Sequence, residues 1–134
     1  MLKGHFIHLV SRVSRMAYHM SNSCIFCKIV SNEAKATVVY KDEQVTAFRD
    51  IHPVAPTHIL IVPNKHIESV RTLEAEDEQL MGHIFSVARK LADDEGISTG
   101  GFRLITNSGA NGGQTVFHLH VHLIGGQRMR YPTG

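Results

Sequence analysis

The sequence predicts an α+β domain with a five-stranded, largely antiparallel sheet, one long helix and a short N-terminal helix. Three observations support this class. Short runs rich in β-branched residues recur along the chain, one stretch has the period of an amphipathic helix, and no strand-helix-strand alternation is present. At 134 residues, the chain is long enough for a single domain with its own hydrophobic core.

The first predicted elements are short. Residues 24–30 are expected to form a turn or helical entry. Residues 37–40 and 44–48 are rich in valine, threonine and aromatic residues, which is typical of strands, and the polar residues 41–43 separate them. We therefore expect a hairpin near the start of the domain.

Further strands follow a proline-containing loop. Pro53 and Pro56 exclude a helix or a central strand there, because proline lacks the N–H donor that both structures use. Residues 58–62 form the most hydrophobic run of the chain and predict a buried strand. Near the C-terminus, strands are expected over 102–106 and over 117–124.

The long helix is predicted over residues 75–93. Acidic residues occupy its first turn, where they interact favourably with the helix dipole, and Gly96 is expected to end it. Four apolar side chains share one face at helical spacing: Leu80, Ile84, Val87 and Leu91.

Charge divides the chain unevenly. The first 32 residues hold four of the 14 lysines and arginines and no acid, so the remainder carries ten basic residues against 12 acidic ones. This balance argues against a nucleic-acid-binding surface. No apolar run is long enough to cross a membrane, and 43% hydrophobic residues fit a globular protein.

The N-terminus is expected to be an appendage. We assign residues 1–20 to an extension and residues 21–134 to the domain. The basic, acid-free segment 1–16 fits an organellar transit peptide, a misassigned start or an expression leader. The expected location is cytoplasmic, with organellar import if the segment is a true transit peptide.

Three histidines alternate with apolar residues between positions 117 and 124. Alternation is the period of a strand, so His118, His120 and His122 are expected on one face, ~6.6 Å from one to the next. The outer pair then lies ~13 Å apart, too far to share one zinc ion. A polar strand face would mix other residue types, so the pattern indicates a site whose histidines have different roles.

A metal site is predicted elsewhere. Cys24-x-x-Cys27 provides half of a tetrahedral zinc site, and His66 and His118 are the candidates for completing it. Four protein ligands leave no open position, so the zinc would be structural. A redox pair and two simple buried cysteines are the alternatives.

A glycine-rich loop precedes the histidines. Gly109, Gly112 and Gly113 allow positive φ angles and expose backbone N–H groups, as anion-binding nests do. A plain hairpin connection is the alternative. The loop lacks the Lys-Ser/Thr ending of a P-loop, and its position beside the histidines favours phosphate binding.

Several separated motifs together resemble the histidine triad (HIT) superfamily, and most closely its purine nucleoside phosphoramidase branch. The likeness covers residues 24–134. It rests on Asp50-Ile51, Ala55-Pro56-Thr57-His58, Gly112-Gly113-Gln114, the run from His118 to Ile124, and Gly125-Gly126.

The resemblance implies roles for the histidines. His120 matches the nucleophile, which attacks the α-phosphorus and forms a nucleotidyl-histidine intermediate. Its second nitrogen is expected to donate to the carbonyl of His118, and His122 to hold the phosphoryl oxygens. His58 matches a supporting group behind the triad. Thr115 stands where this branch often has serine near the leaving group.

The resemblance also implies the ligands. Ile25, Phe26, Phe48 and Ile51 match the slot for the base, and Asp50 matches the acid that binds the ribose. The phosphate-facing positions are Asn107, Gly113, Thr115 and Val116, together with His120 and His122. Cys24, Cys27, His66 and His118 match the zinc-binding members of the superfamily. No organic cofactor is expected, and the branch implies a homodimer in which the tail around Tyr131 reaches the partner.

The expected function is hydrolysis of purine nucleoside 5′-phosphoramidates, derivatives of AMP or GMP. Three alternatives remain: a diadenosine polyphosphate hydrolase or nucleotidyl transferase using the same intermediate, a nucleotide-binding scaffold with weak activity, and a redox protein built on the two cysteines.

Overall fold

The computed structural model describes residues 23–130. The predicted extension over residues 1–20, including the transit-peptide segment 1–16, lies outside this range, as does the tail around Tyr131. Among the described residues, no helix combines the length and the hydropathy that a membrane span requires.

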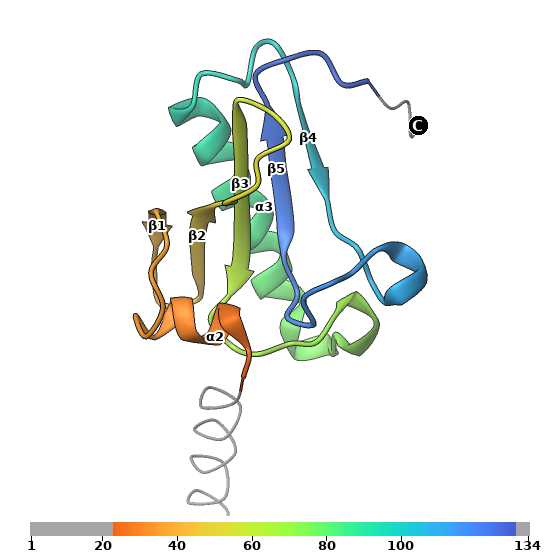
Figure 1. The fold of residues 1–134 in the computed structure, drawn as a ribbon. Helices are drawn as coiled ribbons and strands as arrows, with labels where there is room; N and C mark the ends of the chain where they lie inside the picture. The colour runs from red at the N-terminus through yellow and green to blue at the C-terminus, as the bar shows by residue number, and fades with distance from the viewer. Residues whose placement is uncertain (1–22, 131–134) are drawn as a thin grey trace, which may run out of the picture.

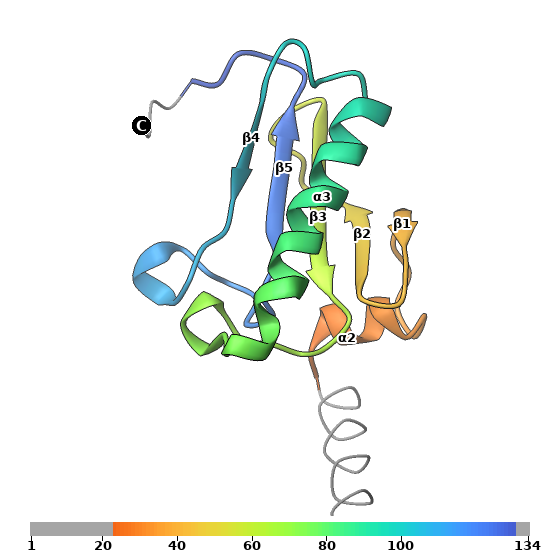
Figure 2. The same ribbon diagram turned by 180° about the vertical axis from the view of Figure 1, so that it is seen from behind.

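A five-stranded antiparallel sheet forms the centre of the structure, in the order β1-β2-β3-β5-β4 (Figure 1). The long helix α3 covers one face, which is seen most clearly from behind (Figure 2). The short helix α2 packs on the opposite face. This arrangement confirms the predicted α+β class. The elements are α2 (Ile25–Val30), β1 (Val38–Lys41), β2 (Val45–Arg49), β3 (Thr57–Pro63), α3 (Glu78–Asp94), β4 (Phe102–Ile105) and β5 (Val121–Gly125), with single 3-10 turns at Val70–Thr72, Ala75–Asp77 and Ala110–Gly112.

The hairpin of β1 and β2 is closed by one acidic side chain. Asp42 Oδ1 accepts hydrogen bonds from the backbone N–H groups of Gln44 at 2.7 Å and Val45 at 2.8 Å. An aspartate that bonds to N–H groups two and three residues ahead stabilises a tight turn. The predicted polar turn is therefore present, and β2 is almost entirely buried.

The main core lies between the sheet and α3. Every residue of β3 is buried, as expected for the central strand of the sheet. The predicted helical face is confirmed, since Ile84, Val87 and Leu91 are buried against the sheet. The helix begins three residues later than predicted because 75–77 forms a 3-10 turn, and it ends before Gly96, which has a φ of 73°.

A second, smaller core lies on the opposite face of the sheet. Phe26 and Ile29 of α2 pack against Phe48 of β2 and Leu60 of β3. Because side chains alternate along a strand, the residues on this face are those between the positions that meet α3. This face also carries the histidines.

The histidine strand is shorter than predicted. The expected strand over 117–124 is wrong at its start, because β5 begins only at Val121. The Leu119 N–H donates to the carbonyl of Ile67 at 2.7 Å instead of joining the sheet ladder. The three histidines therefore do not form one straight row, and His118 points away to a different set of partners.

Candidate active site and metal centre

His120 has the geometry of a histidine with one nitrogen available for attack. Its Nδ1 lies 2.7 Å from the carbonyl oxygen of His118, as predicted. A carbonyl can only accept, so Nδ1 carries a hydrogen, and in the neutral ring the lone pair lies on Nε2. Thr106 Oγ1 donates to the backbone carbonyl of His120 at 2.9 Å. The side chain is 6% exposed, so its orientation is held by its surroundings.

An aromatic group borders this histidine. The rings of Phe26 and His120 meet edge to face with centroids 5.1 Å apart, and Phe26 and Phe48 do the same at 5.4 Å. Val116 packs against the same cluster. The other two predicted slot residues lie at the surface, Ile25 with 45% and Ile51 with 83% exposure. The flat face of a bound base could cover these exposed side chains, so their role stays a prediction.

His58 and His122 form a directed hydrogen-bond chain. The backbone N–H of Val54 donates to His58 Nδ1 at 3.2 Å, so His58 carries its hydrogen on Nε2. That Nε2 lies 2.9 Å from His122 Nδ1 and 3.4 Å from Asp50 Oδ2. His122 Nδ1 accepts, which places the hydrogen of the neutral His122 ring on Nε2. The chain therefore prepares His122 as a hydrogen-bond donor.

Burial favours the neutral form of both rings of this chain. Burial lowers the pKa of His58, and the nearby Asp50 carboxylate only partly opposes it. Burial, with repulsion from His120 and His58, lowers the pKa of His122 to about 4. A neutral His122 at physiological pH is consistent with the tautomer that the hydrogen bonds require.

The lowered pKa of His122 predicts acid sensitivity. In the unfolded chain His122 takes up a proton near its ordinary pKa of about 6.5, whereas the folded protein does so only near 4. The difference between the two states therefore has no effect on stability above pH 6.5. As the pH falls from 6.5 to 4, protonation of His122 in the unfolded chain lowers the free energy of unfolding by about 3 kcal/mol in total. Urea unfolding of wild type and His122→Asn between pH 7 and pH 4 should show a shallower fall for the variant. Identical slopes would contradict the assignment.

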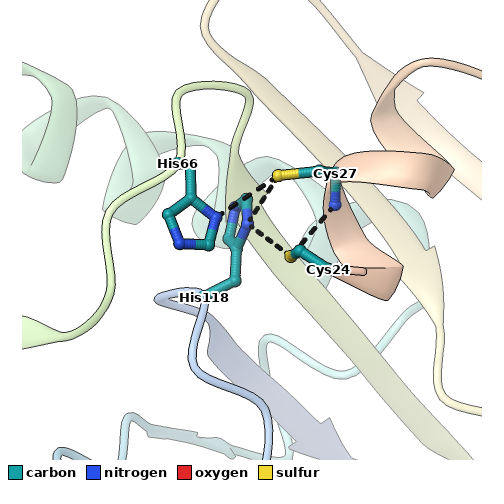
Figure 3. Close-up of side chains that lie close together, drawn as sticks. All are labelled: Cys24, Cys27, His66 and His118. Atoms are coloured by element: carbon teal, nitrogen blue, oxygen red, sulfur yellow. Dashed lines mark hydrogen bonds between the residues drawn. The ribbon is translucent and has the colours of Figure 1, made fainter. Parts of the chain in front are cut away.

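The predicted metal ligands come together at the edge of the smaller core (Figure 3). Cys24 and Cys27 come from the start of α2, His66 from the segment after β3, and His118 from the segment before β5. His118 Nδ1 lies 3.4 Å from Cys24 Sγ and 3.6 Å from Cys27 Sγ, and His66 Nδ1 lies 3.3 Å from Cys27 Sγ. In an ideal tetrahedral zinc site the sulfur and nitrogen ligands lie about 3.5 Å apart, so the spacing fits.

The chemistry of this cluster also fits a cation. His118 Nε2 lies 2.8 Å from the carbonyl oxygen of Pro63 and donates to it, which leaves a lone pair on Nδ1. Burial raises the pKa of the Cys27 thiol to about 12, and its hydrogen bond with Cys24 adds to this. A bound Zn²⁺ would deprotonate both thiols. A raised thiol pKa is the reverse of what a redox-active dithiol needs, so the redox alternative is disfavoured.

A second group of possible ligands fits a metal poorly. Asp50, His58 and His122 each offer an atom within 4.8 Å of the others. However, the N–H of Val54 occupies Nδ1 of His58, so Nε2 carries a hydrogen and has no lone pair for a metal. The short contact between His58 and His122 is a hydrogen bond. This group therefore differs in chemistry from the cluster of two cysteines and two histidines.

The predicted phosphate loop has the expected backbone at two of its three glycines. Gly109 and Gly113 have positive φ angles of 79° and 89°, which favour glycine. The expectation is wrong for Gly112, which lies in the 3-10 turn Ala110–Gly112 and has no positive φ. Gly113 and Thr115 are exposed, and Asn107 is partly buried at the start of the loop. Their contact with phosphate stays a prediction.

Gln114 is a structural residue of this loop that we did not predict. Its side chain is 5% exposed and has three backbone partners. Oε1 accepts from the N–H of Gly109 at 2.8 Å, and Nε2 donates to the carbonyls of Glu68 at 2.7 Å and Val116 at 3.1 Å. One amide thus joins the loop to the segment that follows His66. A glutamine in a polar loop gives no sequence signal for such a role.

Replacing Gln114 should weaken the loop. Gln114→Leu keeps the volume but leaves the N–H of Gly109 and two carbonyls without this partner, so the free energy of unfolding should fall by about 2–4 kcal/mol. Gln127, whose exposed side chain donates one long hydrogen bond of 3.3 Å to the carbonyl of Val54, provides the matched control as Gln127→Leu. Chemical denaturation measures both. An equal, small effect would contradict the bridging role.

Comparison with known families agrees with this geometry. The family model of the HIT domain matches residues 31–129, which is most of the chain. The chain belongs to the HIT family. The matched segment contains all three histidines of the triad together with Asp50 and His58, and it begins after the two cysteines.

Named relatives support the same assignment. The purine nucleoside phosphoramidase of Escherichia coli K12 is 51% identical over 108 residues, covering 81% of this chain and 91% of that protein. An uncharacterized HIT-like protein of Synechococcus elongatus is 44% identical over 115 residues, covering 86% of this chain and all of that protein. A crystal structure of a HIT family hydrolase from Legionella pneumophila superposes with a TM-score of 0.81 at 48% identity, covering 84% of this chain and all of that one.

Proposed function

We propose that the protein hydrolyses the P–N bond of purine nucleoside 5′-phosphoramidates through His120. The hydrogen bond from His120 Nδ1 to the His118 carbonyl carries this proposal, because it leaves Nε2 as the attacking nitrogen. The 51% identity to a purine nucleoside phosphoramidase supports the substrate class.

The reaction proceeds in two displacements. The lone pair of His120 Nε2 forms a bond to the α-phosphorus while the P–N bond to the amine breaks, and the departing nitrogen keeps that electron pair and takes a proton from solvent. Water then attacks phosphorus and gives up a proton to solvent, the electron pair of the breaking histidine–phosphorus bond returns to Nε2, and the nucleoside monophosphate leaves. Two such steps replace one difficult displacement.

His122 stabilises the phosphoryl group. Its Nε2–H is set by the chain from Val54 through His58, so it can donate to a phosphoryl oxygen where charge develops. Backbone N–H groups around Gly113 provide further donors, and the Thr115 hydroxyl lies beside the leaving group.

The nucleoside is held by apolar packing and one acid. The edge-to-face pair of Phe26 and Phe48 borders the base, with Ile25 and Ile51 at its exposed rim. Asp50 accepts hydrogen bonds from the ribose hydroxyls, and AMP and GMP derivatives are the expected ligands. Packing of this kind reads few base edges, so both purines fit.

Cys24, Cys27, His66 and His118 hold a structural zinc ion. The spacing and hydrogen bonding of the cluster support this assignment. Bound zinc would supply a rigid crosslink between α2, the segment after β3 and the segment before β5. It takes no part in the displacement.

We propose that two copies assemble into a homodimer. β4 is an edge strand, and an unpaired edge favours pairing with another chain. Phe102 on this strand is 37% exposed and Phe85 on α3 is 55% exposed, so apolar surface is available. Light scattering should give twice the chain mass, and a monomer would contradict the proposal. The cytoplasmic location stays a prediction from the sequence.

A comparison of the rates on two substrates tests the assigned reaction. Initial rates on adenosine 5′-phosphoramidate and on diadenosine tetraphosphate should favour the phosphoramidate. Activity confined to the dinucleotide would assign the protein to the polyphosphate hydrolases or transferases. Nucleotide binding without turnover of either substrate would leave a scaffold role.

A further inference from the structure

A bidentate ion pair joins the end of β2 to the end of α3. Arg49 Nη1 donates to Glu95 Oε1 at 2.8 Å and Nη2 to Oε2 at 3.0 Å. The hydroxyl of Thr57, a residue that is 5% exposed, donates to the same Oε1 at 3.3 Å. Arg49 is the last residue of β2 and Thr57 the first of β3. One carboxylate therefore holds both strand ends.

The residues next in sequence face the proposed active site. Side chains alternate along a strand, so Asp50 and His58 point to the face opposite Arg49 and Thr57. The backbone N–H of Asp50 donates to the carbonyl of His58 at 2.9 Å, and His58 Nε2 lies 3.4 Å from Asp50 Oδ2. The ion pair on one face thus lies directly behind a pair of polar residues on the other.

The end of β2 has fewer backbone contacts than the start of β3. The ladder between β2 and β3 ends at the pair Arg49 and Ile59, and the Arg49 N–H donates to the carbonyl of Thr37 at 3.0 Å. The start of β3 is held in addition by β5, through the pairs Thr57 with Gly125 and His58 with Ile124. The following loop exposes the side chains of residues 51–54. Strand ends beside an exposed loop are prone to local opening, and small displacements of a binding group weaken its contacts strongly.

We propose that Arg49, Glu95 and Thr57 form a clamp that positions Asp50 for the ribose and His58 for His122. Glu95 is the central positioning residue, since both other members bond to it. The inference rests on the proposed function for the roles of Asp50 and His58. Bidentate contacts between guanidinium and carboxylate fix orientation as well as distance, which suits this task.

Ribose discrimination provides the test. Calorimetry gives the Kd of AMP and of 2′-deoxy-AMP for wild type, Glu95→Gln and the control Asp94→Asn. Asp94 is the neighbouring acid of α3, paired with Lys90 on the exposed surface. A hydrogen bond to a charged carboxylate should give wild type about a tenfold preference for AMP. Glu95→Gln should lower this preference at least about threefold, and Asp94→Asn should leave it unchanged.

Asp50→Ala separates the possible failures, because alanine has no oxygen to accept a hydrogen bond from the ribose. If that variant keeps the wild-type preference, the assigned ribose role of Asp50 is wrong whatever the clamp does. If Asp50→Ala removes the preference while Glu95→Gln behaves like Asp94→Asn, the clamp is overturned. Arg49→Lys keeps the charge but not the bidentate contact, and should give an intermediate preference that is not additive with Glu95→Gln. Thr57→Val provides the same comparison if Glu95→Gln does not fold.

Discussion

His120→Ala is expected to lower kcat for adenosine 5′-phosphoramidate by at least about 10³-fold, because the variant has no atom that can form the covalent intermediate. The loss should appear mainly in kcat, since Phe26, Phe48 and Asp50 still bind the nucleotide. Steady-state kinetics with purified variants measures the effect. Circular dichroism and thermal melting show whether the variant remains folded.

His52→Ala is the matched control for this variant. His52 is an exposed histidine two residues from Asp50, and the bond to Asp50 Oδ1 comes from its backbone N–H, which alanine keeps. Its kcat should stay within about twofold of wild type. Turnover that survives in folded His120→Ala would show that another group is the nucleophile.

Removing zinc is expected to have the largest effect on stability. The ligands come from three separate segments, so the metal crosslinks parts of the chain that fold together. A ligand present a thousandfold above its Kd stabilises the fold by about 4 kcal/mol, and structural zinc commonly gives more. Treatment of the wild type with a chelator should therefore lower the melting temperature markedly. Metal analysis of protein purified in reducing buffer should give about one zinc per chain.

Cys27→Ala removes one of the zinc ligands, so a chelator should not lower the melting temperature of this variant any further. The same variant should lose activity, because the His118 carbonyl that orients His120 belongs to a residue of the zinc cluster. His83→Ala controls for the loss of a partly buried polar side chain outside the cluster, and it should keep the chelator response. Absence of zinc together with chelator-insensitive melting would sink the metal assignment.

The sequence predicted the sheet and helix well because their signals are local. Apolar spacing identified the buried face of α3, and Pro53 and Pro56 identified the loop between β2 and β3. The start of β5 was missed for a different reason. Alternation continues through Leu119, but the backbone of Leu119 bonds to Ile67 instead of the ladder, and no local pattern reveals that choice.

Some residues of the candidate site could likewise be predicted from the sequence, and others could not. Cys24-x-x-Cys27 and the histidine triad are dense motifs of chemically distinctive residues, so the sequence singled them out. Gln114 and Glu95 act through contacts with residues far away in the chain. A glutamine in a loop and a glutamate at a helix end are common at the surface, so only the folded structure reveals their partners.

Intact-mass measurement of the protein during turnover tests the central claim most directly. A histidine–phosphorus bond is an acid-labile phosphoramidate, so the reaction of adenosine 5′-phosphoramidate should be stopped in alkali before analysis. We predict an adenylyl adduct that accumulates within one turnover, maps to His120 and is missing in His120→Ala. If the wild-type protein turns over the substrate without forming an adduct, or forms the adduct on another residue, the proposed mechanism is contradicted.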